Sequence, residues 1–169
     1  MRFLGTCLVV LACIGFGLGL CGTRLRRIRV LRELERALGL LAGELGTSVR
    51  PTETLCALLA RRCAGDVGSF FQSVVSALPT LAERPFAEIW EEAALCSLGC
   101  LRAEEQALVA GLGGSLGRFE LARQLEAVEL CREEIRSALR EAKSAYPAEK
   151  KLCLGLSVSA AAMLAILLL

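Results

Sequence analysis

The sequence predicts an all-α protein, a helical bundle of about six helices flanked by N- and C-terminal transmembrane helices. Two observations predict the flanking helices, because residues 3–21 and residues 152–169 contain no charged side chain. A third predicts the bundle, since apolar residues between these segments recur at intervals of three and four. No segment alternates with a period of two between hairpin signals, so a sheet is not expected.

The two uncharged segments have nearly the length of a membrane span. At about 1.5 Å per helical residue, each reaches just under the hydrocarbon core of a bilayer, which is about 30 Å thick. We therefore predict an N-terminal anchor at residues 1–22, a helical domain at 23–150 and a C-terminal anchor at 151–169. Two alternatives stay open: a cleaved secretion signal at the first segment, where residues 10–13 loosely resemble a lipidation site, and a buried core helix at the second.

Basic residues flank both segments on the side of the central domain. Since the flank richer in Lys and Arg stays cytoplasmic, we expect a two-pass protein of the cell membrane with its central domain in the cytoplasm. The two anchors would then run antiparallel. The flanking basic residues are Arg24, Arg26, Arg27, Arg29, Arg32 and Arg36 after the first segment, and Arg140, Lys143, Lys150 and Lys151 before the second.

Composition excludes some classes of function. The net charge is only +2 and the basic excess lies beside the anchors, so a nucleic-acid surface is not expected. The nine cysteines predict buried free thiols rather than disulfides or zinc sites, because the chain has no histidine and five of them lie in a domain expected to be reduced. These five are Cys56, Cys63, Cys96, Cys100 and Cys131, and the other four, Cys7, Cys13, Cys21 and Cys153, lie in or beside the anchors.

The first helix of the domain is predicted by an apolar stripe through residue 45. Pro51 suits the first turn of a second helix, which runs to about Cys63. Gly65 closes that helix, and Asp66 is expected to cap a third, near whose end Pro79 lies. The stripe of the first helix consists of Leu25, Ile28, Leu31, Leu34, Leu38, Leu41 and Leu45.

The third and fourth helices carry most of the aromatic residues of the domain, and we expect them to form the centre of its core. Pro85 opens the fourth helix, in which Trp90 shares a face with other apolar residues and three glutamates lie opposite. The apolar residues are Phe70, Phe71, Val74, Val75 and Leu78 in the third helix and Phe86, Ile89, Trp90, Ala93 and Ala94 in the fourth; the glutamates are Glu88, Glu91 and Glu92.

A fifth helix begins around Arg102, with Glu104 and Glu105 in its first turn, and leads into a glycine cluster at residues 111–117. The cluster resembles a phosphate-binding loop only in composition, because no strand precedes it and no Lys-Ser or Lys-Thr follows, so we expect a flexible or closely packed helix end. Its apolar side is Leu101, Leu108, Val109 and Leu112.

The last helix of the domain is expected from Phe119 to about Tyr146, and Pro147 is expected to break or kink it. Because the first and last helices both continue from anchors in one membrane, we expect them to lie side by side and antiparallel. Glu129 with Arg132, and Glu133 with Arg136, are spaced to pair on its solvent side. Its apolar stripe is Leu121, Leu125, Val128, Ile135, Ala138, Leu139 and Ala142.

Residues for catalysis are missing from the sequence. It has no histidine, the commonest general base, and no pattern of a hydrolase nucleophile, a nucleotide-binding loop or a zinc protease. We therefore predict a protein that is not an enzyme, without a cofactor or small-molecule substrate, and we name no catalytic, cofactor-binding or metal-binding residue.

The order of these features resembles the stage III sporulation protein AB family of endospore-forming bacteria over nearly the whole chain. The sequence departs from the family pattern at Arg50-Pro51-Thr52, where the family usually has Thr-Pro-Leu, and at Arg118-Phe119, where Ser-Asp is common. The resemblance is carried by residues 27–34 (RIRVLREL), Glu44-Leu45, Pro51 with Leu58 and Ala60, Phe70-Phe71, Trp90 in AEIWEEAAL, Leu112-Gly113, Leu116-Gly117, Gln124 and residues 151–155 (KLCLG).

The resemblance implies a non-enzymatic component of the channel complex that joins mother cell and forespore. It implies a bundle like the F-domains of type II secretion and type IV pilus platform proteins. By that analogy, the partners are a cytoplasmic secretion-type ATPase (stage III sporulation protein AA) and other channel proteins on the mother-cell side. A membrane-permeabilising protein and a platform subunit of another secretion or pilus system remain alternatives.

Overall fold

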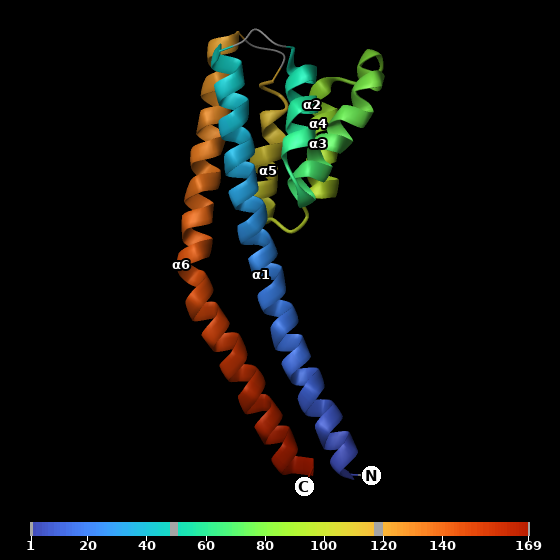
Figure 1. Cartoon of the computed structure of the whole chain (residues 1–169), viewed down its shortest axis with the longest axis vertical. Coiled ribbons are helices and arrows are strands. Elements are labelled where there is room, and N and C mark those ends of the chain that lie inside the picture. The colour runs from blue at the N-terminus through green and yellow to red at the C-terminus, as the bar shows by residue number, and fades with distance from the viewer. Residues whose placement is uncertain (1, 48–50, 117–119, 169) are drawn as a thin grey trace. The chain divides into compact units, whose positions relative to one another are not determined.

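A computed structural model (Figure 1) describes the backbone of residues 2–47, 51–116 and 120–168, and the side chains of 22–46, 51–116, 120–147 and 159. Over these residues the chain is all-α, with no strand, which confirms the predicted fold class of the bundle. The elements are α1 (Arg2–Thr47), α2 (Thr52–Arg62), α3 (Gly65–Ala77), the short 3-10 helix η1 (Leu78–Ala82), α4 (Phe86–Ser97), α5 (Ala103–Leu112) and α6 (Leu121–Leu168).

Backbone contacts divide the chain into two units. One unit, Arg29–Arg140, contains α2 to α5 together with the adjoining parts of α1 and α6. The other consists of Met1–Ile28 and Glu141–Leu169, which are the remaining parts of α1 and α6. The domain limits at 22/23 and 150/151 are tested by neither unit and stay predictions.

The predicted anchors lie almost entirely among residues whose side chains are not described. Among the residues whose side chains the structure describes, no helix is both long enough and apolar enough to cross a membrane. Some features that carry the family resemblance or depart from it also lie outside the described residues. They are Arg50, Gly117 with Arg118-Phe119, and the side chain of Lys151.

Both long helices differ from their predicted limits. α1 is one helix from Arg2 to Thr47, so the first helix of the domain is the continuation of the N-terminal segment. α6 begins at Leu121 and passes through Pro147, so a break at this proline was wrong, and the other expectation, a kink, stays a prediction. Proline removes one backbone hydrogen bond, and a helix with many intact turns on both sides can continue past it.

The core of the unit Arg29–Arg140 lies around Trp90 of α4. This side chain is 1% exposed, and its ring lies 4.8 Å from that of Phe70, edge to face, and 5.9 Å from that of Phe71. Its indole Nε1 donates a hydrogen bond of 2.7 Å to the carbonyl oxygen of Val109 in α5. These contacts confirm that Phe70, Phe71 and Trp90 are at the centre of the core, whereas Phe86 is only half-buried.

The end of the glycine cluster that follows α5 is closely packed. A Cβ at Gly113 would lie 2.7 Å from three atoms of Trp90, so only a residue without a side chain fits between α5 and this ring. Glycine at this position therefore serves packing in the core, and the expectation of a closely packed helix end is confirmed at Gly113.

The turn from α2 to α3 depends on two glycines. Gly65 has a φ of +60°, a conformation that L-residues rarely adopt, and a Cβ at Gly68 would meet the carbonyl oxygen of Cys63 at 2.6 Å. Asp66 lies in the first turn of α3 and Ala64 is its N-cap, with no side-chain cap, so the predicted capping role of Asp66 was wrong. Its negative charge still lies at the positive end of the helix dipole.

The predicted stripe of α1 is buried except at one end. Leu25 is 42% exposed, whereas the six later members of the stripe are at most 9% exposed. The last helix behaves similarly, since Leu121 is 45% exposed while Val128, Ile135 and Leu139 are buried. The periodicity therefore identified the correct face of each helix but extended it too far.

Candidate interaction surfaces

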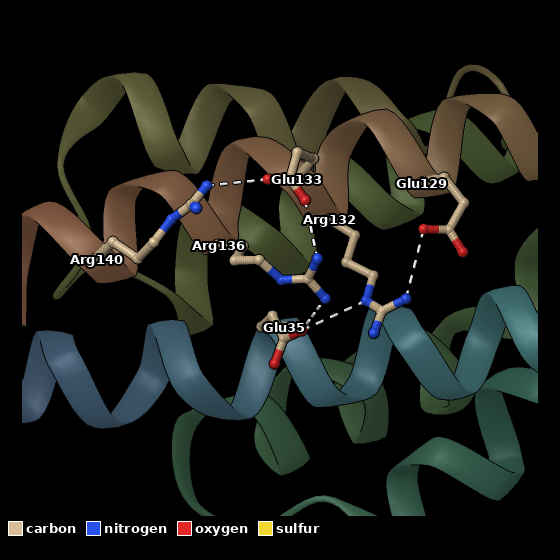
Figure 2. A network of polar contacts seen from close by, with 6 residues as sticks. All are labelled: Glu35, Glu129, Arg132, Glu133, Arg136 and Arg140. Carbon is tan, nitrogen blue, oxygen red and sulfur yellow. Dashed lines mark hydrogen bonds and ion pairs between the residues drawn. The ribbon is translucent and has the colours of Figure 1, made fainter.

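A network of charged side chains joins α1 to α6 (Figure 2). Oε1 of Glu35 in α1 accepts a hydrogen bond of 2.8 Å from Arg136 and lies 3.5 Å from Nε of Arg132, both in α6. Contact of one glutamate with residues one turn apart fixes the register of the two helices, and it confirms the prediction that they lie side by side. The guanidinium of Arg132 also lies against α1 at Gly39, where an added Cβ would be 3.0 Å from it.

The network continues along α6. Arg132 and Arg136 pair with Glu129 and Glu133 at 3.4 and 2.9 Å, which confirms both predicted pairings. Their expected place on the solvent side was wrong for the arginines, because both also contact Glu35 of α1. Arg140 adds a contact of 3.0 Å to Glu133. The role of Glu35 was missed, because its partners are about 100 residues away in the sequence and no local spacing indicates them.

Glu35 is the central acceptor of this network. The hydrogen bond from Arg136 is the main cause that lowers the pKa of the Glu35 carboxyl group, and the charges of Arg136 and Arg132 act in the same direction against partial burial. The charge of Glu35 is therefore stabilised in the folded protein. Nε of Arg132 is buried and makes no hydrogen bond, since 3.5 Å is an ion-pair distance only.

The α1–α6 pair exposes one face to solvent, which we call the outer face. On α1, buried Leu31, Leu34 and Leu38 lie to one side of Glu35, while exposed arginines lie to the other. On α6, buried Val128 and Ile135 lie to one side of Arg132, and exposed glutamates lie to the other. The outer face consists of Arg29, Arg32, Arg36 and Leu40 of α1 and Glu126, Glu129, Leu130, Glu133 and Glu134 of α6.

A second exposed surface lies on α4, opposite the side that carries Trp90. Its glutamates are exposed, as predicted, and Arg84 contacts Glu92 at 2.7 Å and Glu88 at 3.7 Å. Leu95 is 53% exposed on the same side of the helix. We call this the α4 surface, and it consists of Arg84, Glu88, Glu91, Glu92 and Leu95.

The five cysteines of the described domain form no disulfide. Cys56 and Cys131 are buried, as predicted, and burial raises the pKa of each thiol to about 12. Burial also raises the pKa of Cys63 to about 11. Thiols with such values are protonated at neutral pH and are poor nucleophiles. Cys96 is exposed and Cys63 and Cys100 are only half-buried, so the expectation of burial was wrong for Cys96 and holds only in part for the other two.

Acidic residues at the start of α5 have different surroundings. Glu105 is 7% exposed, and its carboxylate accepts a hydrogen bond of 2.9 Å from the backbone N–H of Arg102. This contact caps the helix. Among the described residues, no group of three Cys, Asp or Glu side chains is placed to hold a metal ion.

Comparisons with known proteins agree with this architecture. A solved structure described as stage III sporulation protein AB matches with a TM-score of 0.65 and 21% identity, covering 72% of this chain and 97% of that one. This likeness shows a shared fold. No match was found among curated proteins. The sequence model of the family described as stage III sporulation protein AB matches residues 2–169. The chain therefore belongs to the stage III sporulation protein AB family.

Proposed function

We propose that this chain is a non-enzymatic, membrane-anchored structural and docking component of the sporulation channel complex between mother cell and forespore. The observation that carries the proposal is the family match over residues 2–169, which makes this a sporulation protein. Its helical bundle, held by a packed aromatic core and an ion network, suits a rigid adaptor. The analogy with platform proteins of type II secretion adds support at the level of fold only.

The anchoring part of the proposal places both ends in the cell membrane and residues 23–150 in the cytoplasm of the mother cell. Its support is the pair of uncharged end segments with basic residues on their inner flanks. Protease added outside intact cells should leave residues 29–140 undigested, whereas the same protease should digest them after the cells are opened. Digestion in intact cells would contradict the proposed orientation.

The docking part of the proposal names a secretion-type ATPase, stage III sporulation protein AA, as the partner at the α4 surface. Three carboxylates and one guanidinium lie on the same side of α4 as the exposed side chain of Leu95, so the surface is acidic beside an apolar residue. It lies on the helix that also carries the buried Trp90, so it is held rigidly by the core. By charge complementarity, we expect a contacting surface on the ATPase that is basic around an apolar pocket.

The test is copurification of the full-length chain, in mild detergent, with the ATPase from the same organism. We expect the ATPase to be recovered with the natural sequence and lost with Leu95→Asp. The matched control is Leu121→Asp, a change at another exposed leucine, which should retain it. If the ATPase is not recovered with the natural protein, the docking role is contradicted. If it is recovered equally with both variants, the α4 surface is excluded as its binding site.

A further inference from the structure

We propose that two copies of this chain associate through their outer faces, so that α1 of each copy packs on α6 of the other. The inference concerns a different surface from the α4 surface and does not depend on the ATPase. It follows from the distribution of charge on the outer face, where α1 contributes three exposed arginines and α6 contributes four exposed glutamates. Within each copy Glu33 pairs with Arg36 at 3.6 Å and Arg140 pairs with Glu133 at 3.0 Å, so the α1 row stays basic and the α6 row stays acidic by their excess of charge.

The ion network gives the relative height of the two rows. Because Glu35 contacts both Arg132 and Arg136, its neighbour Arg36 lies at the level of Glu133 and Glu134. The two rows are therefore opposite in charge and lie at the same position along the helix axes.

A two-fold axis can run parallel to the helices, in front of the outer face and midway between α1 and α6, so that the outer faces of two copies lie against each other. The rotation lays α1 of the second copy over α6 of the first, with residues of equal height opposite one another. Arg36 of each copy then faces Glu134 of the other, and both contacts join opposite charges. Because a two-fold axis relates the two copies, each such contact occurs twice.

Two exposed leucines fit the same arrangement. Leu40 is 38% exposed and Leu130 is 65% exposed, although neighbouring leucines of α1 are buried. Gly39 is level with Arg132, so Leu40 lies close to the height of Leu130. They lie at opposite edges of one outer face, and the two-fold rotation brings Leu40 of each copy to Leu130 of the other. The pair of copies thereby covers apolar surface that a single copy leaves in water.

A second copy fits this face better than a partner of one charge. A uniformly acidic or basic partner would attract one row and be repelled by the other, at a cost that increases as water is excluded. The required partner has an acidic row and a basic row in exchanged places at matching heights. This chain has both rows in that arrangement.

Charge reversal tests the proposal with the full-length chain. Two copies with different tags are produced together, extracted in mild detergent and purified through one tag, and recovery of the other is measured. We expect the natural copies to copurify. When both copies carry Arg36→Glu, or both carry Glu134→Arg, two like-charge contacts form and recovery should fall at least about tenfold.

The decisive sample combines one copy with Arg36→Glu and another with Glu134→Arg. Both contacts between them again join opposite charges, so recovery should return toward the natural level. A variant that failed to fold would not be restored by its partner. Glu91→Arg, an exposed glutamate of the α4 surface, is the matched control and should not change recovery.

Three results would each overturn the proposal: natural copies that do not copurify, single reversals that leave recovery unchanged, and a mixed sample that recovers no more than either reversal alone. If the copies associated only through their terminal segments, the single reversals would leave recovery unchanged, because those segments contain none of the changed residues. The outcome for the ATPase is measured separately with Leu95→Asp, so the two proposals can fail independently.

Discussion

Replacing Gly113 by alanine should destabilise the bundle, although alanine is the better helix former. The backbone at Gly113 has φ −57° and ψ −32°, which alanine adopts without strain, so the conformation itself does not oppose the change. The added Cβ would lie 2.7 Å from Cβ, Cγ and Cδ1 of Trp90, where ordinary contact begins at 3.4 Å. The ring or α5 must therefore move by about 0.7 Å, the difference between these distances.

Trp90 has little freedom to move. Its side chain is 1% exposed, Phe70 lies against its ring and its Nε1 is bonded to Val109, on the helix that leads to Gly113. Overpacking of this kind costs about 1–3 kcal/mol, and the lower entropy of unfolded alanine returns about 0.4–1 kcal/mol. We expect a net loss of about 1–2 kcal/mol in the free energy of unfolding.

The chain contains one tryptophan, so its fluorescence reports on this site alone during unfolding in urea. With a urea dependence of about 1–3 kcal/mol per molar, Gly113→Ala should lower the midpoint by roughly 0.3–2 M. Gly111→Ala is the matched control, because no atom lies within 4 Å of its Cβ, and it should raise the midpoint. A midpoint for Gly113→Ala at or above that of the natural chain would refute the close packing of Trp90.

Three further predictions concern other parts of the domain. Glu35→Gln should lower the urea midpoint at neutral pH. The pKa of Glu35 in the folded protein is lowered from 4.5, so its charge stabilises the fold above pH 4.5, and this stabilisation is lost as the pH falls through the folded pKa. A difference in midpoint from the natural chain that persisted at about pH 2 would contradict the ion-pair role. Alkylation of the native protein, mapped by mass spectrometry, should modify Cys96 rapidly and Cys56 and Cys131 only after unfolding; early modification of the buried pair would show that the core opens. Gly65→Ala should cost about 1 kcal/mol, measured by urea unfolding, because its φ is +60°, and an unchanged midpoint would show that the turn relaxes.

Local spacing predicted those features of the fold that depend on one helix at a time. Leu31, Leu34 and Leu38 are buried because residues three and four apart share a helix face, and the face with the most apolar residues packs inward. The pairs of Glu129 with Arg132 and Glu133 with Arg136 depend on the same geometry. These interactions are encoded within one or two turns, so the sequence suffices to find them.

Features that depend on two distant segments could not be predicted in this way. The contact of Glu35 with Arg136 requires the register of α1 against α6, and the fit of Gly113 to Trp90 requires the position of α5 against α4. Spacing gives the direction of a side chain around its own helix and says nothing of the height of the neighbouring helix. For this reason the outer face was recognisable only once Glu35 had fixed the register.

Three consecutive residues of α1 show how one helix serves the core, the helix seam and the outer face together. Leu34 is 1% exposed, the side chain of Glu35 is 20% exposed and that of Arg36 is 66% exposed. Successive residues differ by about 100° around the helix, so Leu34 points into the core, Glu35 toward α6 and Arg36 toward solvent. A shift of α1 by one residue would bring a charge into the core and remove the acceptor from Arg132 and Arg136. The register that stabilises the bundle is therefore the same register that places the basic row beside the acidic row on the outer face.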